Sequence, residues 1–128
     1  MSVRLKLSIP ILKTLILQST IDFYTQQLGF TCTKHLRQYR RATLKRDNVT
    51  IIFHAGDIDE NVPAKHSERS FSLYIYLENV DELWEELKDK AEICEPLGDR
   101  DWGMRQFSIF DNNGYLLIFG QRVKEEEE

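Results

Sequence analysis

The chain has 128 residues, a formal net charge of −4, and 41% hydrophobic and 30% charged residues. This length and composition predict a single globular domain over residues 1–128, and no apolar run approaches the roughly 20 residues that cross a bilayer. Because residues 1–8 lack the apolar core and cleavage site of a secretory signal, we expect a cytoplasmic protein with no membrane partner.

The first half of the chain predicts one strand, one helix and three further strands. The expected elements are a strand at 6–12, a helix at 19–28, and strands at 30–36, 39–45 and 49–54. Pro10 is typical of an edge strand. Ser19 or Thr20 is expected to cap the helix, and Gly29 to end it.

A polar linker at 59–70 separates this set from a second one with the same order. The second set consists of a strand at 71–77, a helix starting at Asn79, and strands at 92–94, 105–110 and 115–119, with a loop at 96–101. Asn79 and Glu82 are typical of a capping box. The buried stripe of this helix is expected to comprise Val80, Leu83, Trp84 and Leu87.

The order of elements predicts an α+β fold made of two β-α-β-β-β modules. We expect the first module at 1–58, the second at 71–121 and a charged tail at 122–128. Each module has one helix to cover one face of a small curved mixed sheet. The other face then requires a different cover, and a cleft or a partner chain would provide it.

Positive charge is concentrated in the first half of the chain. Residues 1–64 hold 9 Lys and Arg against 5 Asp and Glu, whereas residues 65–128 hold 8 against 16. A basic cluster around Arg41 allows nucleic-acid binding, but apart from Tyr39 it lacks interleaved aromatic residues. We therefore favour a solvated strand face and expect no nucleic-acid partner. Cys32 and Cys94 make no disulfide framework and are each expected to pack as a small apolar residue.

Several segments together resemble one known family. They are F-Y-T-Q-Q-L-G-F at 23–30, R-D-N-V-T-I-I-F at 46–53, Y-I-Y-L-E-N-V-D-E-L-W at 74–84 and D-W-G-M-R-Q-F at 101–107. They resemble the glyoxalase / bleomycin-resistance / extradiol-dioxygenase superfamily, the vicinal-oxygen-chelate fold, and most of all its bleomycin-resistance branch. The resemblance implies a homodimer with ligand clefts between modules or between subunits.

The same resemblance implies where a metal would be bound. Metal-dependent members place ligands at four strand positions, which here correspond to Ile9, Thr50, Ser72 and Ile118. None of these is a histidine or a carboxylate, and hydroxyl groups are poor ligands for the divalent ions concerned. We therefore expect neither a metal nor another cofactor.

Strand alternation extends this correspondence to the neighbouring side chains. If Ser72 and Thr50 point into the cavity, then Tyr74, Tyr76 and His54 do so as well. Aromatic and aliphatic walls with a few polar groups are typical of small-molecule pockets. For the tyrosines, the alternative is that they only fill the sheet face, and for His54 that it is a hydrogen-bonded rim residue.

Trp102 and Arg41 complete the candidate ligand-binding residues. The resemblance implies that Trp102 stacks on the planar part of a ligand, and the alternative is a Trp that closes the sheet end or a dimer interface. Arg41, if it points inward, favours an anionic or carbonyl-bearing ligand, which departs from the cationic bleomycins. The alternative is a solvated arginine.

Three functions are consistent with these residues. The first is a metal-free protein that sequesters an antibiotic or metabolite without catalysing a reaction. The second is a metal-dependent glyoxalase or dioxygenase with atypical ligands. The third is a dimer scaffold that binds no ligand. The four substituted ligand positions favour the first and predict that the protein is not an enzyme.

Overall fold

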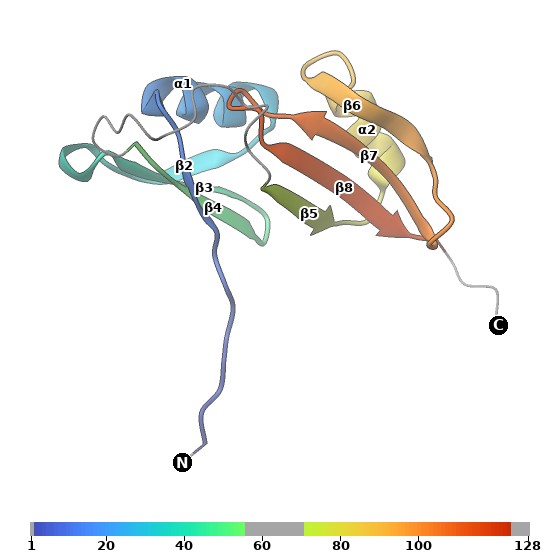
Figure 1. Cartoon of the computed structure of the whole chain (residues 1–128), viewed down its shortest axis with the longest axis horizontal. Helices are drawn as coiled ribbons and strands as arrows, with labels where there is room; N and C mark the ends of the chain where they lie inside the picture. Colours follow the sequence, from blue (N-terminus) through green and yellow to red (C-terminus); the bar gives the residue numbers. More distant parts are fainter. Residues whose placement is uncertain (1, 56–70, 124–128) are drawn as a thin grey trace. The chain divides into compact units, whose positions relative to one another are not determined.

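The computed structural model describes residues 2–55 and 71–123 and divides the chain into two compact units, Met1–Ile58 and Asp59–Glu128. The first unit contains β1 (Ile11–Lys13), α1 (Leu17–Asp22), a π-helical segment (Phe23–Gln27), β2 (Thr31–Leu36), a 3-10 turn (Arg37–Tyr39), β3 (Arg41–Arg46) and β4 (Val49–His54) (Figure 1). The second contains β5 (Ser72–Tyr76), α2 (Val80–Leu87), β6 (Glu92–Asp99), β7 (Met104–Phe110) and β8 (Leu116–Arg122). The predicted linker at 59–70 and residues 124–128 of the predicted tail lie outside the described residues.

Each unit forms its own four-stranded mixed sheet, and the two sheets share one topology. The strand orders are β1-β4-β3-β2 and β5-β8-β7-β6. In each sheet the first strand pairs in parallel with the last strand of its module, and the other pairs are antiparallel. The expected α+β class and order of elements are confirmed. In the described ranges, no helix is long and apolar enough to cross a membrane.

One face of each sheet is buried against the helix of its own unit. In the first unit, Tyr24 of the π-helical segment packs against Phe53, with ring centroids 5.1 Å apart. In the second, the ring of Trp84 on α2 contacts that of Phe107 on β7 at 5.2 Å. Trp84 is half-buried rather than fully buried, because it lies at the margin of the helix stripe. The opposite face of each sheet points away from that helix, and we call it the open face of the sheet.

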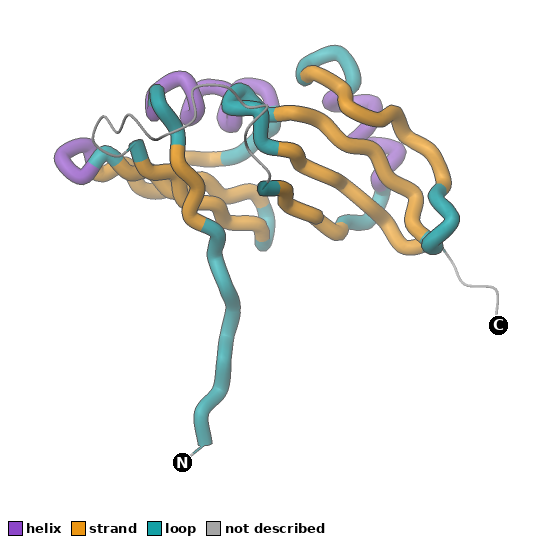
Figure 2. Tube along the Cα trace, in the orientation of Figure 1, coloured by secondary structure: helices purple, strands orange, loops and turns teal. Residues whose placement is uncertain are grey.

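The chain before β1 differs from the prediction. A strand was expected over residues 6–12, but the strand consists of Ile11–Lys13, which pairs with β4. Residues 2–10 run as an extended segment without regular structure (Figure 2). An alternating sequence forms a strand only where a neighbouring backbone completes its hydrogen bonds. Among the described residues, β4 is such a neighbour for Ile11–Lys13, and its pairing with β1 does not extend to the residues before Ile11.

Neither helix has the side-chain cap that was predicted for it, although Asn79 is the N-cap residue of the second helix. The first helix begins two residues earlier than expected, after Ile16, and has no side-chain cap. The Thr20 side chain is buried instead, and its Oγ1 lies 2.8 Å from that of Thr14. At the second helix, Asn79 has a left-handed backbone and makes no side-chain cap, and the Val80 N–H donates to Gln121 Oε1 at 2.8 Å.

Two smaller expectations for the second unit are also wrong. The expected loop at 96–101 is mostly strand, because β6 continues to Asp99 through register shifts in its pairing with β7. Cys94 is exposed on this irregular strand, whereas Cys32 is half-buried. The hairpin turn was predicted correctly. Asp111 accepts the Gly114 N–H at its backbone oxygen, and its side chain accepts the Asn113 and Tyr115 N–H groups.

Candidate functional site

Aromatic side chains occupy the open face of the second sheet. Tyr74 and Tyr76 on β5 are 41% and 70% exposed, and their ring centroids lie 5.2 Å apart. Leu73 and Ile75 alternate with them and are less exposed. The alternation inferred from the sequence thus holds on this strand, and both tyrosines are on the face opposite α2.

A buried amide connects these aromatic residues. Tyr74 Oη donates to Gln106 Oε1 at 2.5 Å, and Trp102 Nε1 donates to the same oxygen at 3.2 Å. An indole N–H can only donate, so the atom that faces Trp102 must be the amide oxygen. The amide NH₂ of Gln106 has no partner among the described residues, yet no buried side-chain nitrogen there lacks one. The NH₂ thus keeps two donors that no described residue uses.

The position of Tyr74 depends on a glycine of the neighbouring strand. Gly120 on β8 lies opposite Tyr76 and Gln106. A Cβ at this position would lie 2.6 Å from Tyr74 Oη and 3.1 Å from its Cε1. Gly120 therefore leaves the space in which the Tyr74 ring lies along the sheet and reaches Gln106.

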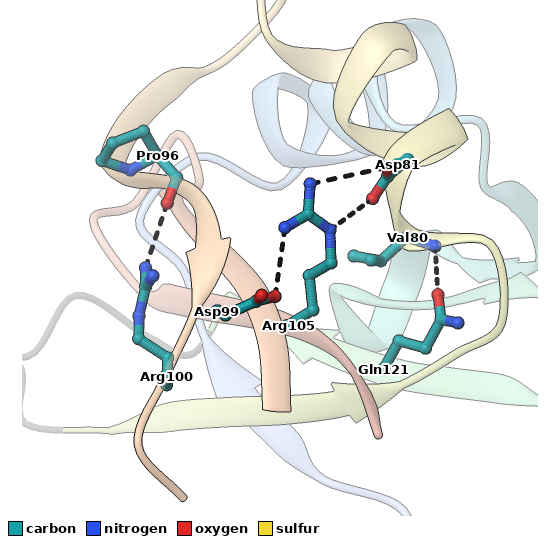
Figure 3. Close-up of polar contacts among 7 residues, drawn as sticks. All are labelled: Val80, Asp81, Pro96, Asp99, Arg100, Arg105 and Gln121. Carbon is teal, nitrogen blue, oxygen red and sulfur yellow. Dashed lines mark hydrogen bonds and ion pairs between the residues drawn. The ribbon is translucent and has the colours of Figure 1, made fainter. Parts of the chain in front are cut away.

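The β6–β7 connection positions Trp102, whose side chain is 64% exposed. Arg100 and Met104 close this connection, because the Arg100 N–H donates to the Met104 carbonyl oxygen at 2.7 Å. The Arg100 guanidinium also donates to the Pro96 carbonyl oxygen at 3.0 Å (Figure 3). Gly103 has a φ of 84°, a left-handed conformation that glycine adopts without strain. The indole is thus presented to solvent by a turn with several backbone contacts.

A polar network on the helix side supports the same strands. Arg105 on β7 donates through Nε to Asp81 of α2 at 2.7 Å and through Nη1 to Asp99 of β6 at 3.1 Å (Figure 3). Gln121 of β8 caps α2 at Val80. These side chains alternate with the open face, so they stabilise the sheet without entering the aromatic site.

The environment of Tyr74 keeps its phenol protonated. Partial burial raises the pKa of Tyr74 above its ordinary value of 10.0. Nearby Tyr76 acts in the same direction, whereas the hydrogen-bonding Trp102 and the charge of Arg100 oppose it. A protonated phenol can donate to Gln106 Oε1, so the protonation state and the observed hydrogen bond agree.

The open face of the first sheet is basic rather than aromatic. Arg41 of β3 lies opposite His54 of β4, and His54 lies next to Lys13 of β1. Both Arg41 and His54 are half-buried. The four strands of this sheet contain no Asp or Glu. The structure therefore places these two predicted site residues side by side, in the other unit from Tyr74, Tyr76 and Trp102.

The positions that correspond to family metal ligands do not fit a divalent ion. Ile118 and Ser72 lie on the open face of the second sheet, and Thr50 on that of the first, while Ile9 precedes β1 outside any strand. The side chains at these positions offer only two hydroxyl groups. Within residues 2–55 and 71–123, no three His, Cys, Asp or Glu side chains are grouped as a metal site.

Gln106 is the one central residue that the sequence reasoning missed. The predicted turn at 111–114 was sufficient to place it on the open face, because the turn sets the register of the hairpin, but not to show its contacts with Tyr74 and Trp102. In that register Ser108 faces Ile118 and Gln106 faces Gly120, on the same face as Tyr74. Gln106 is also a polar residue at a buried position, and buried polar groups usually have hydrogen-bond partners.

Comparisons with known proteins agree with this architecture. The family model described as Glyoxalase/Bleomycin resistance protein/Dioxygenase superfamily matches residues 16–119. A protein named bleomycin resistance protein from Geobacillus stearothermophilus is 30% identical, over 91% of this chain and 97% of its own length. Proteins of the same name from Staphylococcus aureus match to the same extent.

Solved structures share the fold at low sequence identity. A bleomycin-binding protein complexed with bleomycin has a TM-score of 0.73 at 22% identity, with 92% of this chain and 99% of that chain covered. A glyoxalase/bleomycin resistance protein/dioxygenase from Nocardioides has a TM-score of 0.78 at 19% identity, with 98% and 89% covered.

Proposed function

The chain belongs to the glyoxalase/bleomycin resistance protein/dioxygenase superfamily, and within it we propose that this protein binds a small planar molecule without converting it chemically. The observation that carries the proposal is the convergence of Tyr74 and Trp102 on the buried Gln106 amide. Two exposed aromatic rings offer stacking surface, and the Gln106 NH₂, which donates to no described residue, offers a donor for a carbonyl group of the ligand. Sequestration of an antibiotic or metabolite would then depend on affinity alone.

The proposal of a bleomycin-resistance type of ligand has a direct test. The chain holds two tryptophans, so in the Trp84→Phe variant Trp102 is the only fluorophore of that kind. Titration of this variant with bleomycin should change its fluorescence saturably at micromolar drug. Trp102→Ala should weaken binding by about tenfold, because the stacking surface is lost. That affinity can be followed by calorimetry.

A matched control removes an exposed aromatic side chain from the other unit. Tyr39, which is 61% exposed, serves this purpose, and Tyr39→Ala should leave the affinity unchanged. An unchanged affinity in Trp102→Ala would place the binding surface elsewhere. If no planar ligand bound to the wild-type protein, a scaffold without a ligand would be favoured instead.

The alternative of a metal-dependent enzyme is tested by metal analysis. The ligand set required by such chemistry is replaced by Ile9, Thr50, Ser72 and Ile118, which supports a protein without catalysis. Protein purified without chelator should contain only traces of Fe, Mn, Ni and Zn. A near-stoichiometric amount of one of these metals would overturn the proposal.

We further propose that the protein is a homodimer. Val3, Leu5 and Leu7 alternate along the extended segment before β1 and are 90%, 92% and 75% exposed. Exposed apolar residues in such a pattern are typical of a segment that pairs with another chain. Light scattering should give twice the monomer mass, and the double variant Leu5→Lys/Leu7→Lys should be monomeric. A dimer that persists in this variant would require a different interface.

The cytoplasmic location stays a prediction of the sequence.

A further inference from the structure

The open face of the first sheet has a feature that the aromatic site does not explain. Cationic and imidazole side chains gather there on all four strands without a single carboxylate. The cross-strand register assigns the following residues to this face: Lys13, Lys34, Arg41, Lys45 and His54. Such a face attracts anions, because its charges add and no acidic side chain of the sheet offsets them.

The centre of this face is the pair Arg41 and His54. They are direct cross-strand neighbours, and adjacent strands lie about 4.8 Å apart, so one oxyanion can contact both side chains. Lys13 continues the same row on the far side of His54. The hydroxyl-bearing Thr43 lies next along β3 on the same face.

The Arg41 side chain also makes no polar contact with the described residues that would account for its position. The neighbouring Arg46, on the helix side of the same strand, donates to the Leu28 carbonyl oxygen at 2.8 Å. By contrast, Arg41 and His54 are half-buried and have no side-chain hydrogen bond or ion pair within residues 2–55 and 71–123. A half-buried guanidinium has hydrogen-bond donors to satisfy, and an oxyanion is well suited to accept from them.

We propose that the open face of the first sheet binds the oxyanion of a small molecule, a carboxylate or phosphate group, with Arg41 and His54 as its centre. This inference concerns the charge of the ligand and therefore rests on the proposed binding function. A basic face differs from the acidic one that a cationic drug of the bleomycin type would require. The shape of the Arg41 guanidinium suits two parallel hydrogen bonds to one carboxylate.

The test compares two probes of nearly the same shape, benzoate and benzamide, by NMR titration of the ¹⁵N-labelled protein. Benzoate should shift the amide signals of Arg41, Thr43 and His54 and bind about fivefold more tightly than neutral benzamide. Raising the ionic strength from about 0.05 to about 0.5 M should weaken the binding of benzoate but not that of benzamide. Equal affinities for the two probes would overturn the inference.

Matched variants show which positive charge causes the preference for benzoate over benzamide. Arg41→Gln should abolish the preference for benzoate, whereas Lys90→Gln, which removes the same charge from an exposed position after α2, should preserve it. Lys45→Gln, at an exposed position on the basic face, provides a second variant and should lower the affinity for benzoate about twofold. A preference that survives both Arg41→Gln and Lys45→Gln would overturn the assignment.

Two further outcomes distinguish a small-molecule oxyanion site from a nucleic-acid surface and from the aromatic site. If a short oligonucleotide shifted the same amides and displaced benzoate at equal salt, the face would bind nucleic acid and the inference would be wrong. Bleomycin titration of the Trp84→Phe variant tests the aromatic site on its own. Binding there without any preference for benzoate would leave the proposed function intact and remove only the oxyanion site.

Discussion

The two sheets of this protein have the same strand order but different open faces. In β1-β4-β3-β2 the open face carries Arg41 and His54 at its centre, and in β5-β8-β7-β6 it carries Tyr74 and Gln106. The shared topology determines which positions face away from the helix. The chemistry of each face is then determined by a few side chains, so a duplicated module can provide two different binding surfaces.

The faces also differ in how their polar groups are satisfied. On the aromatic face, the Gln106 oxygen accepts hydrogen bonds from both Tyr74 and Trp102. On the basic face, the side chains of Arg41 and His54 make no such bond within the described residues. The aromatic face thus has an internal hydrogen-bond network, and in the described part of the first unit no such network involves Arg41 or His54.

The largest expected effect tests this difference in internal bonding. Gln106→Leu removes the acceptor shared by Tyr74 and Trp102, so we expect the free energy of unfolding to fall by about 1–2 kcal/mol. Arg41→Gln, on the basic face, should change it by less than about 0.5 kcal/mol, because no hydrogen bond to a described residue is lost. Urea unfolding of the two variants measures both values. Equal losses would contradict the contrast between the faces.

A somewhat smaller loss of stability is expected when the glycine beneath the Tyr74 ring is replaced. In Gly120→Ala the new methyl group would lie 2.6 Å from Tyr74 Oη, so the ring must move away from Gln106. We expect a loss of about 1 kcal/mol in stability and a displaced Tyr74 ring signal in NMR spectra.

Gly103→Ala is the control for a backbone effect. It has a φ of 84° and nothing within 4 Å of an added Cβ, so its cost of about 1 kcal/mol arises from backbone conformation alone. The Tyr74 ring signal should stay in place in this control. If both variants displaced that signal equally, steric contact with Gly120 would not be what positions Tyr74.

The sequence was sufficient to predict the class of fold and the faces of some of its strands. Alternation along β4 and β5 placed His54, Tyr74 and Tyr76 correctly on open faces, because one side of each strand is buried against a helix. The turn at Asp111 was predicted because Asp and Gly are suited to its geometry.

The errors concern interactions that depend on distant parts of the chain. The N-terminus of α2 is capped by Gln121, which is 41 residues away from Val80 in sequence, and no local motif could show this. The central position of Gln106 likewise results from side chains on two other segments, Tyr74 on β5 and Trp102 in a connection. Local patterns predict which face a residue occupies, but not which residues meet there.

The smallest expected effect is the response of the aromatic face to alkaline pH. Because the folded protein raises the pKa of the Tyr74 phenol, the folded state binds this proton more tightly than the unfolded state. The resulting stabilisation is complete below the ordinary value of 10.0 and is lost as the pH rises through the higher pKa of the folded state. Above about pH 10, the free energy of unfolding of the wild type should therefore fall relative to that of Tyr74→Phe.

The same comparison can be made with the neighbouring tyrosine as a control. Tyr76 is more exposed than Tyr74, and no hydrogen bond of its side chain occurs within the described residues, so Tyr76→Phe should retain the decrease seen in wild type. Absorbance of the phenolate and urea unfolding, both between about pH 9 and pH 12, measure the titration and its effect on stability. A difference that is independent of pH would mean that Tyr74 is not partly buried in solution as it is in the structure. The packing that holds its ring beside Gln106 would then not exist in solution.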